Sequence, residues 1–291
     1  MRQFEHYPIF INYPARWDRV RERQLADFDA QGDPRMVNWL GPTGNGARLY
    51  EIMEDKTPSR EGREYEDRVY QLLRLIKSTR PGQVLLDSLN RSHDYWVVPK
   101  SNFGVECNCM AVTFPFPKKA GGGIRVYINP NGLLPVQERW LSGDDILFHE
   151  LVHAYRIGKV GWGGQSKQPM REYKDAEEFF ALHMQNVYLG YRGGHRFYRD
   201  FNSLRSVSKG TAYEYFTSDV EVMMAFKYYL INDPVLAPAV ASWAQPADSF
   251  NPFRDYANLE RILLGDGEWE GVKALPPLGS MISGGKIVEG P

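Results

Sequence analysis

The segment Asp144–Arg156 holds the residues of this chain that are best suited to chemistry, because His149, Glu150 and His153 form the pattern H-E-x-x-H there. On a helix, residues i and i+4 lie about 40° apart around the axis, so both imidazoles project from one face and can bind one metal ion. Glu150 projects to the side, where a carboxylate can take a proton from a metal-bound water without being a ligand. The pattern predicts a catalytic centre with one zinc ion per chain.

A catalytic zinc ion needs a third protein ligand and an open fourth position. Arg156 and Lys159 stand where the longer metzincin pattern has a glycine and a third histidine, so we expect the third ligand on a later helix. The segment Tyr173–Gln185 has helical spacing and offers two adjacent glutamates, an aspartate and a histidine. These candidates are Asp175, Glu177, Glu178 and His183.

The two adjacent glutamates compete for the role of third ligand, and helical periodicity alone does not separate them. Successive helical residues are about 100° apart, so only one of Glu177 and Glu178 can face the histidines. The stripe of Glu178 continues through Ala181 and Gln185, which suit the floor of a cleft, while the stripe of Glu177 is more apolar. The alternative is an acidic cluster that only stabilises the start of the helix. The core face is indicated by Ala176, Phe179, Phe180 and Met184.

Two segments together resemble the glutamate-type zincins, or gluzincins, of bacterial toxins and effectors. They are D-I-L-F-H-E-L-V-H-A-Y-R, which ends at Arg156, and D-A-E-E-F-F-A, which ends at Ala181. The specific similarity covers Asn129 to Tyr191 and is to effector metallopeptidases of type III and type VI secretion and to the catalytic domain of anthrax lethal factor. Residues 203–260 resemble that effector group only loosely.

The resemblance implies a role for each acidic residue of the second segment. The glutamate directly before the two phenylalanines is the zinc ligand in lethal factor, which implies this role for Glu178. Lethal factor also has an acidic residue one turn after its ligand, where this chain has Leu182. Asp175 or Glu177 is therefore expected to support the histidines instead.

The motif and the resemblance together imply a zinc endopeptidase. Zinc lowers the pKa of a coordinated water, and Glu150 takes the proton of that water and returns it to the leaving amine. The tetrahedral oxyanion needs one donor besides zinc, and the sequence does not choose among the side chains near the expected cleft. The candidates for this donor are Tyr173, Tyr213, Tyr215 and His195.

The elements that must position these residues indicate an α+β fold of the zincin-like type, with a small antiparallel sheet, an active-site helix and a mostly helical C-terminal half. Runs of β-branched and aromatic residues predict strands near residues 95–98, 105–114 and 124–128. Helical spacing predicts helices near residues 61–77, 142–157, 171–190, 218–230, 234–243 and 254–264.

We expect a single metallopeptidase domain over residues 1–291. An N-terminal wrapping arm takes residues 1–60, the sheet and zinc-site helices take 61–190, and a helical part with a loose tail takes 191–291. In zincins, the strand before the active-site helix commonly pairs with extended substrate. Arg125 and Tyr127 would then lie on a substrate-binding edge, or else their strand is only the last of the sheet.

Composition argues against two classes of partner and leaves only a local basic patch open as a site for nucleic acid. The formal net charge of -1 argues against nucleic-acid binding through a broad basic surface. The sequence contains no apolar run long enough to span a membrane, so we expect no membrane insertion. The start MRQFEHYPIFINYPARW has no apolar core after a basic region. The resemblance to secreted effectors implies a protein made in the cytoplasm and delivered into a target cell without a classical signal peptide. Cys107 and Cys109 lie on one expected strand, and their redox state stays open.

The leading hypothesis is a monomeric bacterial effector or toxin that hydrolyses a protein or peptide of a target cell and meets a secretion-apparatus or immunity protein. A second hypothesis is a zinc hydrolase that acts on bacterial envelope peptide. A third, from a different class, is a non-catalytic, metal-stabilised binding domain. Glu150 argues against the third, because a structural zinc site has no use for a base beside the ion.

Overall fold

The computed structural model of the chain describes residues 1–13, 59–100, 111–115, 123–132, 134–136, 139–161, 164–165, 168–170, 173–193, 196–198, 206–208, 219–233, 235–243 and 251–257. They fall into two compact units. The first unit comprises described residues of Met1–Leu75, Leu89–Leu134 and Trp140–Gly164, and the second those of Ile76–Ser88, Pro135–Arg139 and Gln165–Pro291. The predictions for residues 105–110, for both cysteines and for the tail lie outside the described residues.

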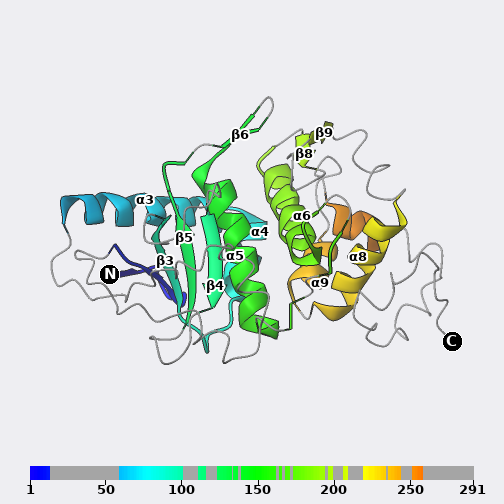
Figure 1. Cartoon of the computed structure of the whole chain (residues 1–291), viewed down its shortest axis with the longest axis horizontal. Coiled ribbons are helices and arrows are strands. Elements are labelled where there is room, and N and C mark those ends of the chain that lie inside the picture. Colours follow the sequence, from blue (N-terminus) through cyan, green and yellow to red (C-terminus); the bar gives the residue numbers. More distant parts are fainter. Residues whose placement is uncertain are drawn as a thin grey trace, which may run out of the picture. The chain divides into compact units, whose positions relative to one another are not determined.

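A five-stranded mixed sheet forms the first unit, in the order β1-β2-β3-β5-β4 (Figure 1). The neighbours β2, β3 and β5 run parallel, while β1 and β4 are antiparallel to the strands beside them. The expectation of a small antiparallel sheet is therefore wrong. The strands are β1 (Arg2–Gln3), β2 (Ile9–Ile11), β3 (Tyr95–Pro99), β4 (Ala111–Pro115) and β5 (Ile124–Ile128).

The mixed sheet arises because the first residues of the chain join it. Ile9 pairs with Tyr95 and Ile11 with Val97, so β2 extends the sheet beyond β3. Ile9 and Ile11 are fully buried, and this burial of apolar surface favours the pairing. Residues 1–13, which the sequence assigned to a wrapping arm, thus supply two strands.

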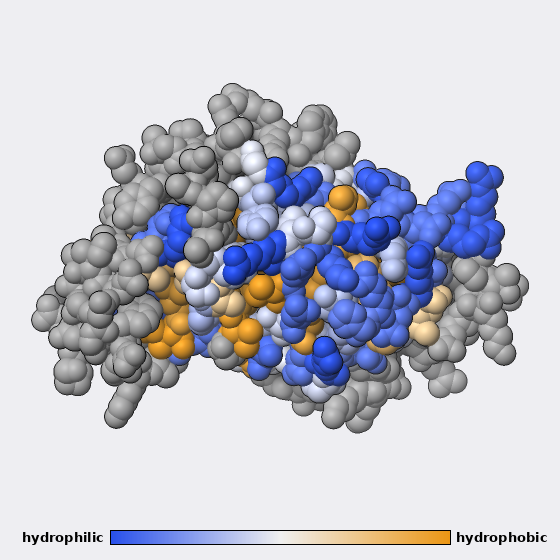
Figure 2. Space-filling model, turned by 180° about the vertical axis from the view of Figure 1, so that it is seen from behind, coloured by the Kyte–Doolittle hydropathy of each residue, from blue (hydrophilic) through white to orange (hydrophobic). Residues whose placement is uncertain are grey.

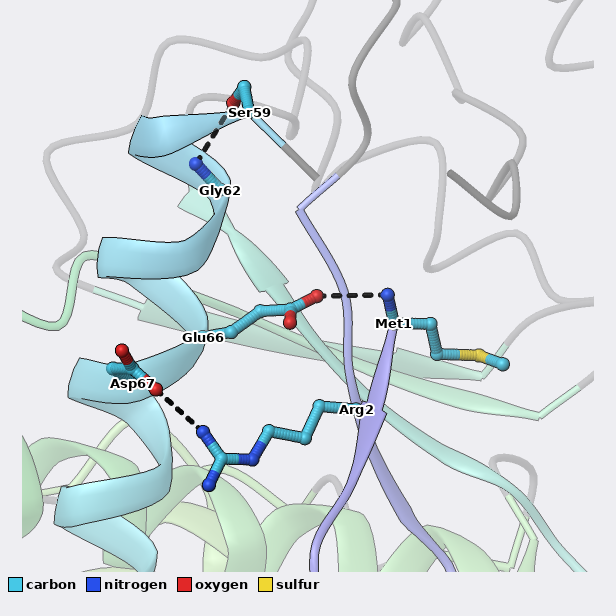
Figure 3. Close-up of polar contacts among 6 residues, drawn as sticks. All are labelled: Met1, Arg2, Ser59, Gly62, Glu66 and Asp67. Atoms are coloured by element: carbon cyan, nitrogen blue, oxygen red, sulfur yellow. Dashed lines mark hydrogen bonds and ion pairs between the residues drawn. The ribbon is translucent and has the colours of Figure 1, made fainter. Parts of the chain in front are cut away.

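Helix α3 (Arg60–Lys77) packs in the same unit and lies beside the start of the chain. Ser59 Oγ accepts a hydrogen bond from the backbone N–H of Gly62 at 3.0 Å, which caps the first turn. Figure 3 shows two further contacts with α3. The amino group of Met1 lies 3.0 Å from Glu66, and Arg2 lies 2.6 Å from Asp67. The buried stripe of α3 consists of Tyr65, Val69, Leu72, Leu73 and Ile76.

Helix α5 (Gly143–Val160) packs against β4 and β5 (Figure 1). At two glycines of α5, neighbouring residues lie so close to the helix backbone that no side chain would fit. A Cβ on Gly143 would lie 2.6 Å from the carbonyl oxygen of Pro130, and one on Gly158 would overlap the hydroxyl of Tyr95. Asn90 Nδ2 also donates to the carbonyl oxygen of Gly158 at 3.0 Å. Both ends of α5 are therefore fixed to the first unit.

The second unit is mainly helical. Its helices α4 (Arg80–Ser88), α6 (Ala176–Tyr191), α8 (Val220–Asn232) and α9 (Leu236–Ala241) surround an aromatic core, and β8 (Arg196–Tyr198) pairs with β9 (Ser206–Ser208). Residues 252–257 are also helical. A separate two-stranded ladder joins β6 (Leu134–Val136) and β7 (Arg139–Leu141). The core rings are those of Phe179, Phe180, Phe226, Tyr229 and Phe253.

Within the described residues, the predicted helices correspond to observed ones with shifts of a few residues at their ends, while residues 258–264 of the last predicted helix lie outside the described residues. The largest shift is at α6, predicted from residue 171 but observed from Ala176, because Asp175 caps it. Among the helices of the described ranges, none has the length and apolar character needed to cross a bilayer.

Candidate metal centre

Helix α5 presents the H-E-x-x-H motif, and its first turn is stabilised by acidic side chains. The backbone N–H and the hydroxyl of Ser142 both donate to Asp145 Oδ2, at 3.1 and 2.7 Å. This is one half of a capping box, formed here by aspartate. Asp144 and Asp145 also lie at the positive end of the helix dipole. The sequence therefore favours a helix start at Gly143, so that the motif lies in its second and third turns.

The two histidines of the motif point their Nε2 atoms toward each other. His149 Nε2 lies 3.1 Å from His153 Nε2, and the ring planes are inclined at 74°. Nitrogen ligands at 2.0–2.1 Å from a tetrahedral zinc ion lie about 3.3 Å apart, so this spacing fits a shared ion. His149 is 9 % exposed and His153 is half-buried. Facing lone pairs in such a setting need a proton or a cation between them.

Glu178 completes a group that could hold a metal ion. His149, His153 and Glu178 each offer one ligand atom, and these atoms all lie within 4.8 Å of one another. Two imidazoles and one carboxylate are one of the ligand sets that catalytic zinc sites use, and they leave a fourth position open. The identity of the metal is not fixed by this geometry.

The local structure of α6 explains how Glu178 is presented. Asp175 Oδ1 accepts a hydrogen bond from the backbone N–H of Glu178 at 3.0 Å, so the helix cap acts on the ligand residue itself. Lys174 Nζ lies 3.7 Å from Glu178 Oε1, a partly exposed ion pair that a metal ion can displace. Glu177 is fully buried and is not part of the metal-capable group found among the described residues.

Glu150 is held by a residue that sequence reasoning missed. Thr113 Oγ1, on β4, lies 2.6 Å from Glu150 Oε2 and 3.1 Å from the backbone carbonyl oxygen of Glu150. Both residues are buried, so the hydroxyl fixes one carboxylate oxygen in a setting where hydrogen bonds to charged groups are strong. Nothing in the spacing of the sequence pointed to Thr113, because its contact depends on how β4 packs against α5.

His183 and Tyr173 belong to the core of the second unit. The hydroxyl of Tyr173 lies 3.0 Å from His183 Nε2, and Asn186 Nδ2 lies 3.5 Å from His183 Nδ1. Burial lowers the pKa of His183 from 6.5 to about 3, because the charged ring would lose its hydration. Tyr173, an oxyanion-donor candidate, is 2 % exposed and its hydroxyl already contacts a histidine. The other candidates, Tyr213, Tyr215 and His195, lie outside the described residues.

The expected substrate edge is not an edge. Strand β5 is hydrogen-bonded to β3 on one side and to β4 on the other, so the expectation that Arg125 and Tyr127 lie on a free edge is wrong. The reason is the joining of β2 and β3 on one side and β4 on the other, which makes β5 central. Both side chains are buried, and burial raises the pKa of Tyr127 above its usual value despite the nearby Arg125.

The site thus combines a metal-capable group of two histidines and a glutamate with a buried carboxylate held on the same helix as the histidines. Comparison with known proteins adds no assignment to this description. No family model, no curated protein and no solved structure matches the chain.

Proposed function

We propose that this chain is a zinc-dependent peptidase in which His149, His153 and Glu178 hold the ion and Glu150 is the general base. One observation carries the proposal: ligand atoms of the types that catalytic zinc uses lie within 4.8 Å of one another, in a chain whose Glu150 stands next to a ligand. A bound zinc ion supplies a water of lowered pKa and polarises the carbonyl of a peptide bond.

The remaining chemistry belongs to Glu150. Thr113 holds Oε2 of its carboxylate at 2.6 Å, which leaves Oε1 to accept the proton of the attacking water. The same carboxyl group then donates that proton to the leaving nitrogen, so that an amine departs instead of an unstable amide anion. Burial of Glu150 keeps bulk water away from this transfer.

The metal assignment is tested by elemental analysis of the purified full chain. We expect one zinc ion per chain, with loss of the metal in His149→Ala and His153→Ala. Glu178→Gln and Glu177→Gln form a matched pair, because they remove one charge from adjacent buried residues of α6. Zinc retained by Glu178→Gln and lost by Glu177→Gln would refute the assignment of Glu178, and a wild-type chain that takes up no zinc would refute the site.

The catalytic role is tested with Glu150→Gln, which is isosteric and leaves the three ligands in place. We expect full zinc content and a loss of at least about a hundredfold in hydrolysis of a quenched fluorescent peptide library, because general base catalysis contributes that much. Wild-type activity in Glu150→Gln would refute the role of Glu150. A chain that binds zinc but cleaves no peptide would support the non-catalytic binding domain.

The setting of a bacterial effector or toxin, with a target-cell protein as substrate, is supported by the resemblance of the segments around His149 and Glu178. Expression inside a eukaryotic or bacterial host tests it, with Glu150→Gln as the control. Growth arrest by the wild type alone supports the effector. Arrest only when the chain is sent to the bacterial periplasm would favour envelope peptide as the substrate. A secretion or immunity partner stays a prediction.

A further inference from the structure

Lys174 forms an ion pair with a candidate metal ligand of the second unit. Its Nζ lies 3.7 Å from Oε1 of Glu178, the glutamate that could hold a metal ion together with His149 and His153. The side chain of Glu178 is 9 % exposed, whereas that of Lys174 is 32 % exposed. A nearly buried carboxylate thus has a cation beside it that reaches the solvent.

Ion pairs on the surface of α3 are of a different kind. Arg60 Nε lies 2.9 Å from Glu64 Oε1, and the two side chains are 88 % and 64 % exposed. In Figure 2 hydrophilic side chains gather on the side of the molecule where α3 lies in Figure 1. Water solvates both charges of such a pair, so the pair contributes little to stability. The carboxylate of Glu178 has far less contact with water, so a cation beside it matters more.

The start of α6 is held in place without the help of Lys174. Asp175 Oδ1 accepts a hydrogen bond from the backbone N–H of Glu178, and the backbone carbonyl oxygen of Asp175 accepts one from Phe179, both at 3.0 Å. These bonds fix the backbone that carries Glu178. Lys174 directly precedes the cap, so a substitution there removes a charge and leaves the cap in place.

A zinc ion at Glu178 has to compete with the ammonium group of Lys174. Both are cations, and two positive charges a few ångströms apart repel each other. The lysine side chain is long and one third of it is exposed, so its ammonium can turn into the solvent when an ion binds. Zinc binding then costs the ion pair, and breaking a partly exposed pair lowers the affinity by a factor of about two to five.

We propose that Lys174 and zinc compete for the carboxylate of Glu178, so that Lys174 lowers the affinity of the chain for the ion. This deepens the proposed function and rests on its assignment of Glu178 as a ligand. Before zinc binds, the lysine balances the charge of a nearly buried carboxylate, and the ion has to displace it. Lys174 thus stabilises the zinc-free chain by the same factor by which it weakens zinc binding.

The first measurement is the Kd for zinc of the full chain, by competition with a chromophoric chelator. Lys174→Met removes the charge and keeps an unbranched apolar chain, while Lys174→Arg keeps the charge. Lys159→Met is the matched control, because Lys159 is an exposed lysine at the end of α5 whose Nζ lies 5.9 Å from the ring of Tyr155.

We expect the Kd to fall about two- to fivefold in Lys174→Met and to stay unchanged in Lys174→Arg and Lys159→Met. The difference between wild type and Lys174→Met should shrink at about 1 M salt, because salt screens the ion pair.

The second measurement is urea unfolding with chelator present. Lys174→Met should unfold at a lower urea concentration than wild type, because Glu178 loses its cation. In a chain that already carries Glu178→Gln, the same substitution should not lower the unfolding midpoint, since no carboxylate is left to pair with. A lysine that only supports the local backbone would instead destabilise both chains and weaken zinc binding.

The outcomes separate this proposal from the metal assignment itself. If wild type binds zinc and Glu178→Gln loses it, an unchanged or higher Kd in Lys174→Met overturns the proposal and leaves the assignment intact. Equal destabilisation by Lys174→Met with and without Glu178→Gln also overturns it. A wild-type chain that takes up no zinc, or a Glu178→Gln chain that holds zinc as tightly as wild type, overturns the assignment and the proposal together.

Discussion

His183→Gln should make the folded chain less sensitive to acid, because His183 is held in its neutral form. The ring is fully buried between Phe179 and Phe226, with Tyr173 on its Nε2 atom. Its pKa is about 3 in the folded chain against an ordinary value of 6.5. Below pH 6.5 the unfolded chain therefore binds one more proton than the folded chain. The contribution of neutral His183 to the free energy of unfolding is therefore complete above pH 6.5 and declines as the pH falls from 6.5 toward 3.

The size of the effect follows from the width of that window. One proton more in the unfolded state lowers the free energy of unfolding by about 1.4 kcal/mol for each pH unit below the unfolded pKa. Between pH 7.5 and pH 5, the loss due to His183 alone amounts to about 2 kcal/mol. This range lies mostly above the titration of carboxylates and well above the folded pKa of His183.

The assay is urea unfolding of wild type and His183→Gln at several values between pH 7.5 and pH 5, with chelator present so that metal binding does not contribute. Glutamine retains a hydrogen-bonding group for Tyr173 but does not titrate. The variant is expected to be less stable at pH 7.5, yet to lose about 2 kcal/mol less on acidification. His93→Gln, on the turn before β3, controls for the removal of a histidine as such. Equal pH dependence of wild type and His183→Gln would refute the reasoning.

Three further changes test the elements around the site, each by urea unfolding. Asp175→Ala should cost about 1 kcal/mol by removing the cap of α6, and Asp175→Asn should restore most of it; equal stability of the two would contradict the cap. Thr113→Val should lower the free energy of unfolding by about 1–3 kcal/mol, because Glu150 loses its hydrogen bond to the hydroxyl of Thr113. Thr113→Ser keeps that hydroxyl, so a Thr113→Val variant more stable than Thr113→Ser would contradict this contact. Gly158→Ala should lower the free energy of unfolding by about 1–3 kcal/mol, because the added Cβ would overlap the hydroxyl of Tyr95. If that hydroxyl is the obstacle, adding Tyr95→Phe to Gly158→Ala should recover part of the loss.

The helices could be predicted from the sequence because their signals are local. Ser142, the acidic first turn and the apolar residues of the motif all favour a helix where α5 begins at Gly143. The start of α6 was predicted too early, because helical spacing continues through residues 171–175 while the cap at Asp175 decides the boundary. Caps depend on one side-chain oxygen, which periodicity does not detect.

The sheet could not be predicted because its pairings are far apart in sequence. Ile9–Ile11 is a short strand next to Pro8, and its partner begins at Tyr95, so nothing local identifies it as part of the sheet. The central position of Ile124–Ile128 follows from these distant pairings, which is why its edge was misjudged. The contact of Thr113 with Glu150 has the same origin, since it depends on how β4 meets α5. The grouping of His149, His153 and Glu178 was accessible from residue types and resemblance.

The fixing of α5 at both ends has a consequence for the energetics of ion uptake. Pro130 closes against Gly143 at one end, while Tyr95 and Asn90 hold Gly158 at the other. The two imidazoles are therefore carried by a helix whose two ends are packed closely against neighbouring residues of the first unit. Small zinc-dependent domains expend binding energy on folding, whereas here little of it is consumed in ordering these two ligands. Zinc should therefore exchange at this pair of histidines as a simple association, without refolding of the helix that bears them.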